Sequence, residues 1–366
     1  SGTSMDGVDA ALVAFGDRRC DVLNAQNLPY TDALRDRLLQ TIRTPGSVAI
    51  DDLGRLDADI GGAFRDAALQ LLETAGRTAQ DVVAIGSHGQ TIRHRTQDDL
   101  PFSWQFGDPN IIAAGTGIAT VADLRRRDIA EHGEGAPLAP AFHHWLFGND
   151  ENCVVLNLGG IANVTILDAD PARVRGYDTG PANTLMDAWA RRHLQKAFDQ
   201  NGSWAASGST DESLLDELLA DPWFARPPPK STGFEDFNLD WLDDRLGGRE
   251  IEPAHVQATL LALTCRSVAE AIRRDAPDTA EVIVCGGGVH NAVLMAALGR
   301  ELAPIRVASI AERGIDPDWV EAALFAWLAR ETLAGRPGNL PSVTGAARPV
   351  VLGAVYAGAA AIPTIS

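Results

Sequence analysis

The chain has 366 residues and a formal net charge of −18 at pH 7, with 45% hydrophobic and 22% charged residues. This length predicts two domains or one large domain with a substantial core. The acidic excess argues against a nucleic-acid partner, because phosphate backbones are held by clustered Lys and Arg. No run approaches the roughly 20 consecutive apolar residues of a membrane span, so we expect a soluble protein without a membrane partner.

The cysteines are scattered singly along the chain, without a C-x-x-C pair, at Cys20, Cys153, Cys265 and Cys285. No secretory signal stands at the N-terminus. We therefore expect buried free thiols and a cytoplasmic location.

Three glycine-rich turns interrupt strand-like runs. The chain opens GTSMDG and continues VDAALVAF; CVVLNLGGIANVTIL, at 153–167, predicts strand, turn and strand; EVIVCGGGVHNAVLMAAL, at 281–298, predicts strand, turn and helix. No initiator Met and no strand precede Gly2, which leads us to expect a sequence clipped at its start.

The first two turns lead into strands, whereas a P-loop or a dinucleotide fingerprint leads directly into a helix. These two sites are therefore neither Walker nor Rossmann motifs. Two similar hairpins about 150 residues apart predict a duplicated domain that grips a phosphate chain with backbone N–H groups.

The segments between the turns predict an α/β protein. Apolar spacing predicts helices in DALRDRLLQTI, in LGRLDADIGGAFRDAALQLLETAG and at 182–197, 211–220, 256–274 and 318–334. We expect a first domain at 1–135, a second at 136–344, and a C-terminal strand that returns to the first domain at about 345–366. RPPPKSTGFEDFN predicts a stiff proline-rich loop.

Nine segments together resemble the anhydro-N-acetylmuramic acid kinases, a family within the actin, hexokinase and heat-shock-70 ATPase superfamily. They are GTSMDGVD, IGSHGQTIRH, VADLRRRDIA, GEGAPLAPAFH, LNLGGIANV, GYDTGPANTLMDAW, PKSTG, CGGGVHN and TGAARPVVLGAVY. The resemblance implies a two-lobed actin-like fold of duplicated ribonuclease-H-like domains, with mixed sheets flanked by helices around a cleft. It also implies ATP, Mg²⁺ and a homodimer.

The reaction that the resemblance implies opens the 1,6-anhydro ring of the sugar with water and phosphorylates O6, in cell-wall recycling. A kinase for another anhydrosugar such as levoglucosan is one alternative. A nucleotide-gated, non-catalytic binding protein of the same superfamily is another.

The glycine turns supply the predicted nucleotide site. Glycine permits close approach of backbone to phosphate, and Asp6 is the expected Mg²⁺ ligand through water. An ordinary acidic turn, or tight packing at the third turn, is the alternative. The predicted residues are Gly2, Thr3, Ser4, Met5, Asp6, Gly7, Val8, Asp9, Asn157, Gly159, Gly160, Asn163, Gly286, Gly287 and Gly288.

Asp178 is the predicted catalytic base. Pro181 suits the first turn of the helix that follows, so we expect Asp178 ahead of that turn, favoured in its ionised form by the positive end of the helix. The alternative is a capping residue. Glu321, on a helix expected to be mostly buried, is the predicted supporting residue, and an exposed helix edge is its alternative.

Polar residues that end the strands of SHGQTIRH and VADLRRRD are the candidates for the sugar. An arginine fork is the natural partner of a carboxylate, although the triple arginine at 125–127 could equally be a solvated run or an ion-pair cluster. The predicted substrate residues are Gln90, Thr91, Arg93, Asp123, Arg126 and Asn183.

Overall fold

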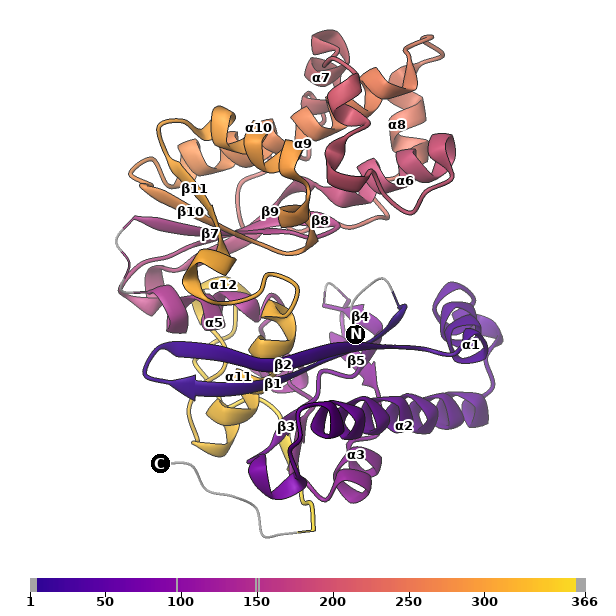
Figure 1. Ribbon diagram of the computed structural model, residues 1–366, viewed down its shortest axis with the longest axis vertical. Coiled ribbons are helices and arrows are strands. Elements are labelled where there is room, and N and C mark those ends of the chain that lie inside the picture. The colour runs from indigo at the N-terminus through magenta and orange to yellow at the C-terminus, as the bar shows by residue number, and fades with distance from the viewer. Residues whose placement is uncertain (1–4, 97, 149, 151, 360–366) are drawn as a thin grey trace. The chain divides into compact units, whose positions relative to one another are not determined.

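The computed structural model describes residues 5–96, 98–148, 150 and 152–359, and the chain forms two compact units (Figure 1). Unit 1 comprises Ser1–Leu146 and Trp319–Ser366, and unit 2 comprises Phe147–Asp318. These boundaries differ from those expected near 135 and 345. Helix α11 (Val320–Leu333) accounts for the second difference, because it packs against strands of unit 1.

The strands of unit 1 form three small sheets. A long antiparallel hairpin joins β1 and β2, β4 pairs with β5, and β6 lies between β12 and β3. The C-terminal β12 therefore pairs with a strand of the first unit. The strands are β1 (Gly7–Gly16), β2 (Arg19–Pro29), β3 (Ile85–Gly86), β4 (Gln90–Arg95), β5 (Phe102–Phe106), β6 (Thr120–Ala122) and β12 (Ala354–Tyr356).

Helices surround these sheets. Helix α2 runs along the β1–β2 hairpin and α3, while α11 contacts β1, β3 and β6 (Figure 1). Thr31 caps α1 by accepting from the amide of Leu34, and Gly76 follows α2 with a positive φ of 61°. The other helices are α1 (Asp32–Arg43), α2 (Ile50–Thr74), α3 (Pro109–Thr116), α4 (Arg126–Ala130), α5 (Ala139–Phe147) and α12 (Pro341–Thr344).

Unit 2 is built on one five-stranded mixed sheet in the order β11-β10-β7-β8-β9. Strands β11, β10 and β7 are parallel, whereas β7, β8 and β9 are antiparallel, and β9 is an edge strand. The strands are β7 (Cys153–Leu158), β8 (Ile161–Ile166), β9 (Arg175–Pro181), β10 (Glu281–Cys285) and β11 (Arg306–Ser309).

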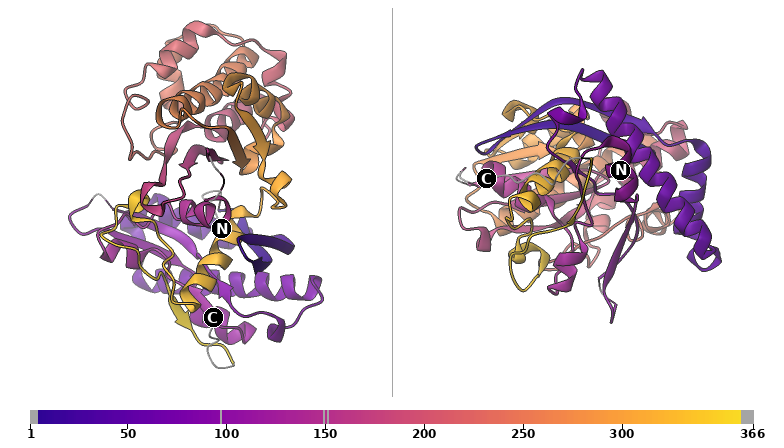
Figure 2. Two further views of the ribbon diagram at one scale, coloured as in Figure 1. Left: turned by 90° about the vertical axis from the view of Figure 1, so that its left-hand side faces the viewer. Right: turned by 90° about the horizontal axis from the view of Figure 1, so that it is seen from below.

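Helices α9 and α10 lie on one face of this sheet (Figures 1 and 2). Asn291 caps α10 by accepting from the amide of Leu294 at 3.0 Å. The core between the sheet and the helices includes Leu156, Leu260 and Leu294, all fully buried. The helices are α6 (Asn183–Leu194), α7 (Glu212–Leu219), α8 (Leu239–Leu246), α9 (Pro253–Asp275) and α10 (Ala292–Leu302).

The expected α/β class, with mixed sheets flanked by helices, is confirmed. The predicted strand–turn–strand at 153–167, the strand–turn–helix at 281–298 and the loop at 226–238 are confirmed as well. Two short helices, α4 and α5, follow β6. The four cysteines are free and buried, as expected.

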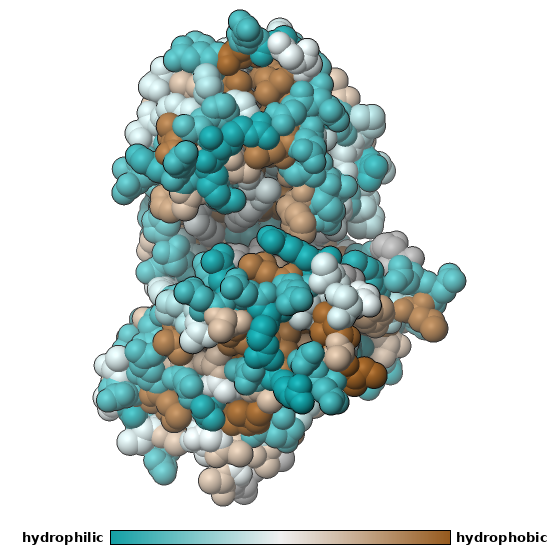
Figure 3. Space-filling model, turned by 90° about the vertical axis from the view of Figure 1, so that its right-hand side faces the viewer, coloured by the Kyte–Doolittle hydropathy of each residue, from teal (hydrophilic) through white to brown (hydrophobic). Residues whose placement is uncertain are grey.

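One face of the surface is drawn by hydropathy in Figure 3. Hydrophilic residues cover most of the face drawn in Figure 3, and apolar residues form separate spots on it. None of the helices in the described part of the chain has the length and apolar character needed to cross a membrane.

Candidate active site

Three polar residues form a row across the sheet of unit 2. Asn157 on β7 stands opposite Asn163 on β8, and Asn163 stands opposite Asp178 on β9. Residues paired directly across strands project from the same face of a sheet. The row lies at the end of β7 that leads into Gly159 and Gly160, so the predicted base and two of the predicted nucleotide residues belong to one site.

A β-bulge sets the position of Asp178. Asn163 pairs with Asp178 and Ala162 with Gly180, so Thr179 is the additional residue on β9. The buried Thr179 hydroxyl donates to the carbonyl of Ala162 at 3.2 Å. A bulge re-aims the side chains beside it, and here it leaves Asp178 in line with the two asparagines.

The carboxylate of Asp178 is largely buried and is held by a distant loop. Its Oδ2 accepts a hydrogen bond of 2.9 Å from the amide of Thr232. Burial raises the pKa of Asp178 to about 6, while the Thr232 amide and the Lys230 charge act in the opposite direction. At neutral pH the carboxylate is therefore mostly ionised, with a pKa close to that of an effective general base.

The helix after Asp178 differs from the expectation. Pro181 is the last residue of β9, and α6 begins at Asn183, because the bulge and the pairing with β8 extend the strand. The first amides of the α6 segment are already used: those of Ala182 and Thr184 donate to the Gly160 carbonyl, and that of Asn183 donates to Gly159. The positive end of α6 thus supports the second glycine turn rather than Asp178.

Asn183 also holds that turn with its side chain. Its Nδ2 donates to the carbonyls of Leu158 at 3.1 Å and Gly159 at 2.8 Å. We predicted Asn183 as a sugar contact, and its amide nitrogen instead fixes the turn. No local pattern in the sequence indicates this bond.

The second and third glycine turns pack against each other. Parallel pairing of β10 with β7 places both turns at the same edge of the sheet. A Cβ on Gly286, whose φ is 81°, would lie 2.4 Å from Asn157 Oδ1, and a Cβ on Gly288 would lie 2.5 Å from Leu158 Cβ. A Cβ on Gly287, between them, would have no neighbouring atom within 4 Å. Such a side-chain-free backbone cradle fits the phosphates of a nucleotide.

A groove of about 440 Å³ lies beside α10, the helix that follows the third turn. Small-molecule sites commonly have volumes of a few hundred Å³. Its lining combines charged side chains, Glu212, Arg266, Arg300 and Glu301, with apolar side chains from α7, α9 and α10: Leu215, Ala258, Leu261, Ala262, Val293 and Ala297.

The first glycine turn is described only from Met5 onward, and the predicted residues Gly2, Thr3 and Ser4 lie outside the described residues. A Cβ on Gly7 would lie 2.5 Å from the Leu28 carbonyl oxygen, so this position requires glycine. The Val8 side chain is in the core, and Val8 pairs with Leu28 on β2. The Asp9 carboxylate accepts from Asn27 on β2.

The described residues contain no group of three or more His, Cys, Asp and Glu side chains that could hold a metal ion. The predicted ligand Asp6 is exposed. Mg²⁺ takes one or two protein carboxylates and completes its shell with water and phosphate oxygens. A single carboxylate such as Asp6 fits that chemistry.

The predicted sugar residues of unit 1 have different surroundings. Gln90 is buried, and Thr91 accepts from Gln105 at 3.2 Å. Asp123 and Arg126 form an exposed ion pair at 2.6 Å. These contacts do not test whether the four residues bind the sugar, so that role stays a prediction.

Arg93 has a structural position. Its guanidinium donates to the carbonyls of Thr41 at 3.3 Å and Ile42 at 2.8 Å, in the last turn of α1, and to its neighbour Ile92. A cation at a helix C-terminus satisfies carbonyls that lack partners within the helix. These bonds engage the guanidinium of Arg93 within unit 1, and its predicted contact with the sugar stays a prediction.

Arg125, not Arg126, is the arginine of the triplet that lies inside the protein. Its Nε donates to His88 Nε2 at 2.9 Å and its Nη1 to the Gly135 carbonyl at 2.7 Å. Among the described residues it forms no ion pair with a carboxylate. Arg125 comes shortly after the end of β6, and this position was the signal in the sequence that could have identified it. Arg127, in contrast, pairs with Glu131.

Two buried polar atoms next to Arg125 have no hydrogen-bond partner in the described part of the chain: Ser87 Oγ and His88 Nδ1. Burial and the Arg125 charge hold the pKa of His88 well below its usual value, so the ring is neutral. Because Nε2 accepts from Arg125, the proton of the neutral ring is on Nδ1. Nδ1 lies near the Gly89 backbone without a well-formed hydrogen bond, and is available as a donor.

Glu321 is exposed, contrary to the expectation of a buried face, because it lies in the first turn of α11. Its charge acts on Arg125 in unit 1, whereas Asp178 belongs to unit 2. The buried glutamate of this helix is Glu331, which is paired with Arg330 and Arg336.

Comparisons with known proteins agree along the whole chain. The family model for anhydro-N-acetylmuramic acid kinase matches residues 1–358. A relative of that name from Xanthomonas campestris pv. campestris (strain 8004) is 55% identical over 97% of this chain and 95% of its own length. Another, from Coxiella burnetii (strain Dugway 5J108-111), is 49% identical over 98% of this chain and 96% of its own.

Solved structures are more distant. A ROK family glucokinase from Streptomyces griseus, in complex with glucose and AMPPNP, is 12% identical, with a TM-score of 0.38 over 89% of this chain and 97% of that one. A likeness at this TM-score adds nothing to the agreement in sequence.

Proposed function

Since the chain belongs to the anhydro-N-acetylmuramic acid kinase family, we propose that it uses ATP to convert 1,6-anhydro-N-acetylmuramic acid into N-acetylmuramic acid 6-phosphate, with Asp178 as the catalytic base. The observation that carries the assignment of the base is the row Asn157–Asn163–Asp178 beside the second glycine turn. An ionisable, largely buried carboxylate beside two neutral amides and a glycine turn supports this assignment.

In the proposed reaction Asp178 takes a proton from a water molecule as that water attacks C1 of the sugar. The bond between C1 and O6 breaks, and O6 takes the γ-phosphoryl group of ATP, leaving ADP. The proton on Asp178 then passes to solvent. The pKa of about 6 suits this cycle, because the group is ionised before the step and gives up its proton readily after it.

The glycine turns of unit 2 would hold the phosphates of ATP through backbone N–H groups. The amides of α6 and the side chain of Asn183 engage the carbonyls of Gly159 and Gly160, which keeps the turn rigid. We place the nucleoside in the groove beside α10, because this groove adjoins the helix of the third turn. Asp6 would hold Mg²⁺ through water, and the ion would neutralise charge on the transferred phosphoryl group.

For the sugar, the donors proposed within unit 1 are Arg125, His88 and Ser87. Arg125 is a cation without a carboxylate partner among the described residues, and the other two supply buried donors that lack acceptors. A buried polar group left without a partner costs about 1–3 kcal/mol. The lactyl carboxylate and a neighbouring oxygen of the sugar would satisfy all three.

The proposal also includes a cytoplasmic location, which is supported by the family and by the four free thiols. It includes a homodimer, which is supported by the family. Equilibrium sedimentation would test the dimer. Levoglucosan, which lacks the lactyl carboxylate, is the alternative substrate against which Arg125 would discriminate.

The deciding experiment is mass spectrometry of the product formed from ATP and the anhydro sugar in ¹⁸O-water. We expect one phosphoryl group on O6, with the heavy oxygen on C1 and none in the phosphate. The matched control is Asp178→Asn, which should bind ATP normally and give no product. Heavy oxygen in the phosphate, or full turnover by Asp178→Asn, would refute the mechanism.

A further inference from the structure

The loop that follows α7 covers the free edge of the sheet at Asp178. The amide of Asp178 donates to the Lys230 carbonyl at 3.1 Å, and the amide of Thr232 donates to Asp178 Oδ2 at 2.9 Å. Because β9 is an edge strand, its free side is open to such contacts from the loop. The Trp223 indole donates to the Ser231 carbonyl at 3.4 Å and anchors the segment from behind.

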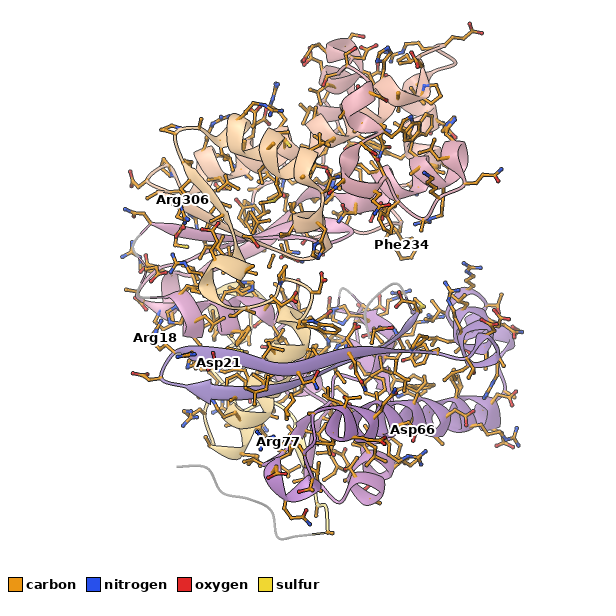
Figure 4. The ribbon with its side chains drawn as sticks, in the orientation of Figure 1. Arg18, Asp21, Asp66, Arg77, Phe234 and Arg306 are labelled. Atoms are coloured by element: carbon orange, nitrogen blue, oxygen red, sulfur yellow. The ribbon has the colours of Figure 1, made fainter. Side chains whose placement is uncertain are left out.

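Lys230 fixes the same loop with its side chain. Its ammonium donates to the Phe224 carbonyl at 3.0 Å and lies 4.2 Å from the centre of the Trp223 ring. A cation over an aromatic face is stabilised electrostatically. Further along this loop Phe234 projects from unit 2 with 67% of its surface exposed (Figure 4).

The residue type at 230 is unusual for this chain. Of its 31 lysines and arginines, the lysines are Lys196 and Lys230. Lys196 is exposed on the surface, whereas Lys230 is partly buried. A lysine ammonium is a compact charge whose pKa shifts readily on burial, unlike the guanidinium of arginine.

Four charged groups act on Lys230. Burial lowers its pKa to about 8, Arg274 and Arg226 act in the same direction, and Asp275 and Asp178 oppose them. In return the Lys230 charge lowers the pKa of Asp178. The two groups are therefore coupled, and each favours the charged form of the other.

We propose that Lys230 is a positioning residue for the reaction, which keeps Asp178 in its carboxylate form while the loop it anchors aims that carboxylate through the Thr232 amide. The proposal rests on the proposed role of Asp178 as the base. Lys230 is assigned no contact with the sugar or the nucleotide.

The kinetic experiment measures kcat/KM for the sugar from pH 5 to 9 in Lys230→Met, Lys230→Arg and Lys196→Met. Removal of the charge should move the midpoint of the acid limb upward by about half to one pH unit, a loss of about 3- to 10-fold near pH 5.5, with the plateau above pH 8 within about two-fold of the parent. Lys230→Arg should restore the midpoint, and Lys196→Met should leave it unchanged. An unmoved midpoint in a folded Lys230→Met would overturn the proposal.

A second experiment needs no turnover. The protein is labelled with ¹³C at the lysine ε-carbons, giving two signals that Lys196→Arg assigns. Coupling between two sites is reciprocal, so Asp178→Asn should lower the midpoint of Lys230 by the amount that Lys230→Met raises that of Asp178. An unchanged Lys230 titration in Asp178→Asn would overturn the proposal even if Lys230→Met failed to fold.

The two experiments separate the inference from the function. If the proposed kinase function is wrong, the parent protein will form no sugar phosphate, while the coupling seen by NMR will persist. If the inference about Lys230 is wrong, the enzyme will be active, but Lys230 and Asp178 will titrate independently.

Discussion

Asp178 and Thr232 are joined by a hydrogen bond of 2.9 Å between a side-chain oxygen and a main-chain amide, although 54 residues separate them in the chain. The proposed base is therefore oriented by a loop of another region and not by the helix that follows it. A proline at position 232 has no N–H, so it cannot donate to Asp178. Among the side-chain contacts of Asp178, the substitution removes this bond alone.

We expect Thr232→Pro to lower kcat about 10-fold or more while the KM for ATP stays within about two-fold, because misplacement of a catalytic group affects the chemical step. The matched control is Thr232→Ala, which keeps the amide and loses the bond from the hydroxyl to Asp236. Steady-state kinetics with both substrates measures the effect. Equal losses of kcat in the two variants would show that the hydroxyl, and not the amide, matters.

The raised pKa of Asp178 also predicts a gain in stability on removing its charge. In the unfolded chain an aspartate titrates near 3.8, and in the folded protein near 6. The folded state thus binds more protons between these values, so Asp178 weakens the protein above pH 6, by up to about 3 kcal/mol at 1.4 kcal/mol per pH unit.

Asp178→Asn should therefore raise the free energy of unfolding at pH 7.5, and the gain should vanish as the pH falls below about 4, where the aspartate is protonated in both states. Denaturant unfolding at pH 7.5 and pH 4 measures the difference. A variant less stable than the parent at pH 7.5 would mean that the carboxylate supports the fold. Activity should be lost in either case, as at other sites where function opposes stability.

Two neighbouring glycines allow packing and ligand contact to be separated. Gly286→Ala introduces a Cβ 2.4 Å from Asn157 Oδ1 at a φ of 81°, so we expect a loss of stability of about 2 kcal/mol or more. Gly287→Ala meets no atom within 4 Å, and it should leave the melting temperature nearly unchanged.

If the phosphates of ATP lie against this turn, Gly287→Ala should still raise the KM for ATP about 10-fold, with the KM for the sugar unchanged. Thermal unfolding and steady-state kinetics on the same preparations give both quantities. A normal KM for ATP in Gly287→Ala would remove the third turn from the nucleotide site.

Local patterns predicted much of unit 2. Alternating apolar residues around Gly159 and Gly160 predicted β7 and β8, and the helical spacing from 256 to 274 predicted most of α9. Asp178 could be singled out by its place shortly before a predicted helix, within the segment GYDTGPANTLMDAW that resembles the family. These features depend on residues close together in sequence.

What the sequence did not predict depends on distant partners. The bulge at Thr179 arises from the pairing of β9 with β8 and displaces the start of α6 beyond Pro181. The bonds from Lys230 and Thr232 to β9 join segments whose proximity no local pattern encodes.

The two arginines that differ most from expectation supply the last prediction. Arg93→Met removes donors from the Thr41 and Ile42 carbonyls at the end of α1, so we expect a loss of stability of about 1–2 kcal/mol with an unchanged KM for the sugar. Arg125→Met removes the cation beside His88, which has no carboxylate partner among the described residues, and replaces it with an apolar side chain of similar length, which limits the cost in stability.

Arg125→Met should raise the KM for the carboxylate-bearing anhydro sugar at least 10-fold, and should have little effect with levoglucosan, which has no carboxylate to pair. Kinetics with both sugars and thermal unfolding of both variants form a complete comparison. If Arg93→Met raises the KM for the sugar while Arg125→Met does not, the assignment is reversed, and the contact of Arg93 with α1 is secondary to its contact with the ligand.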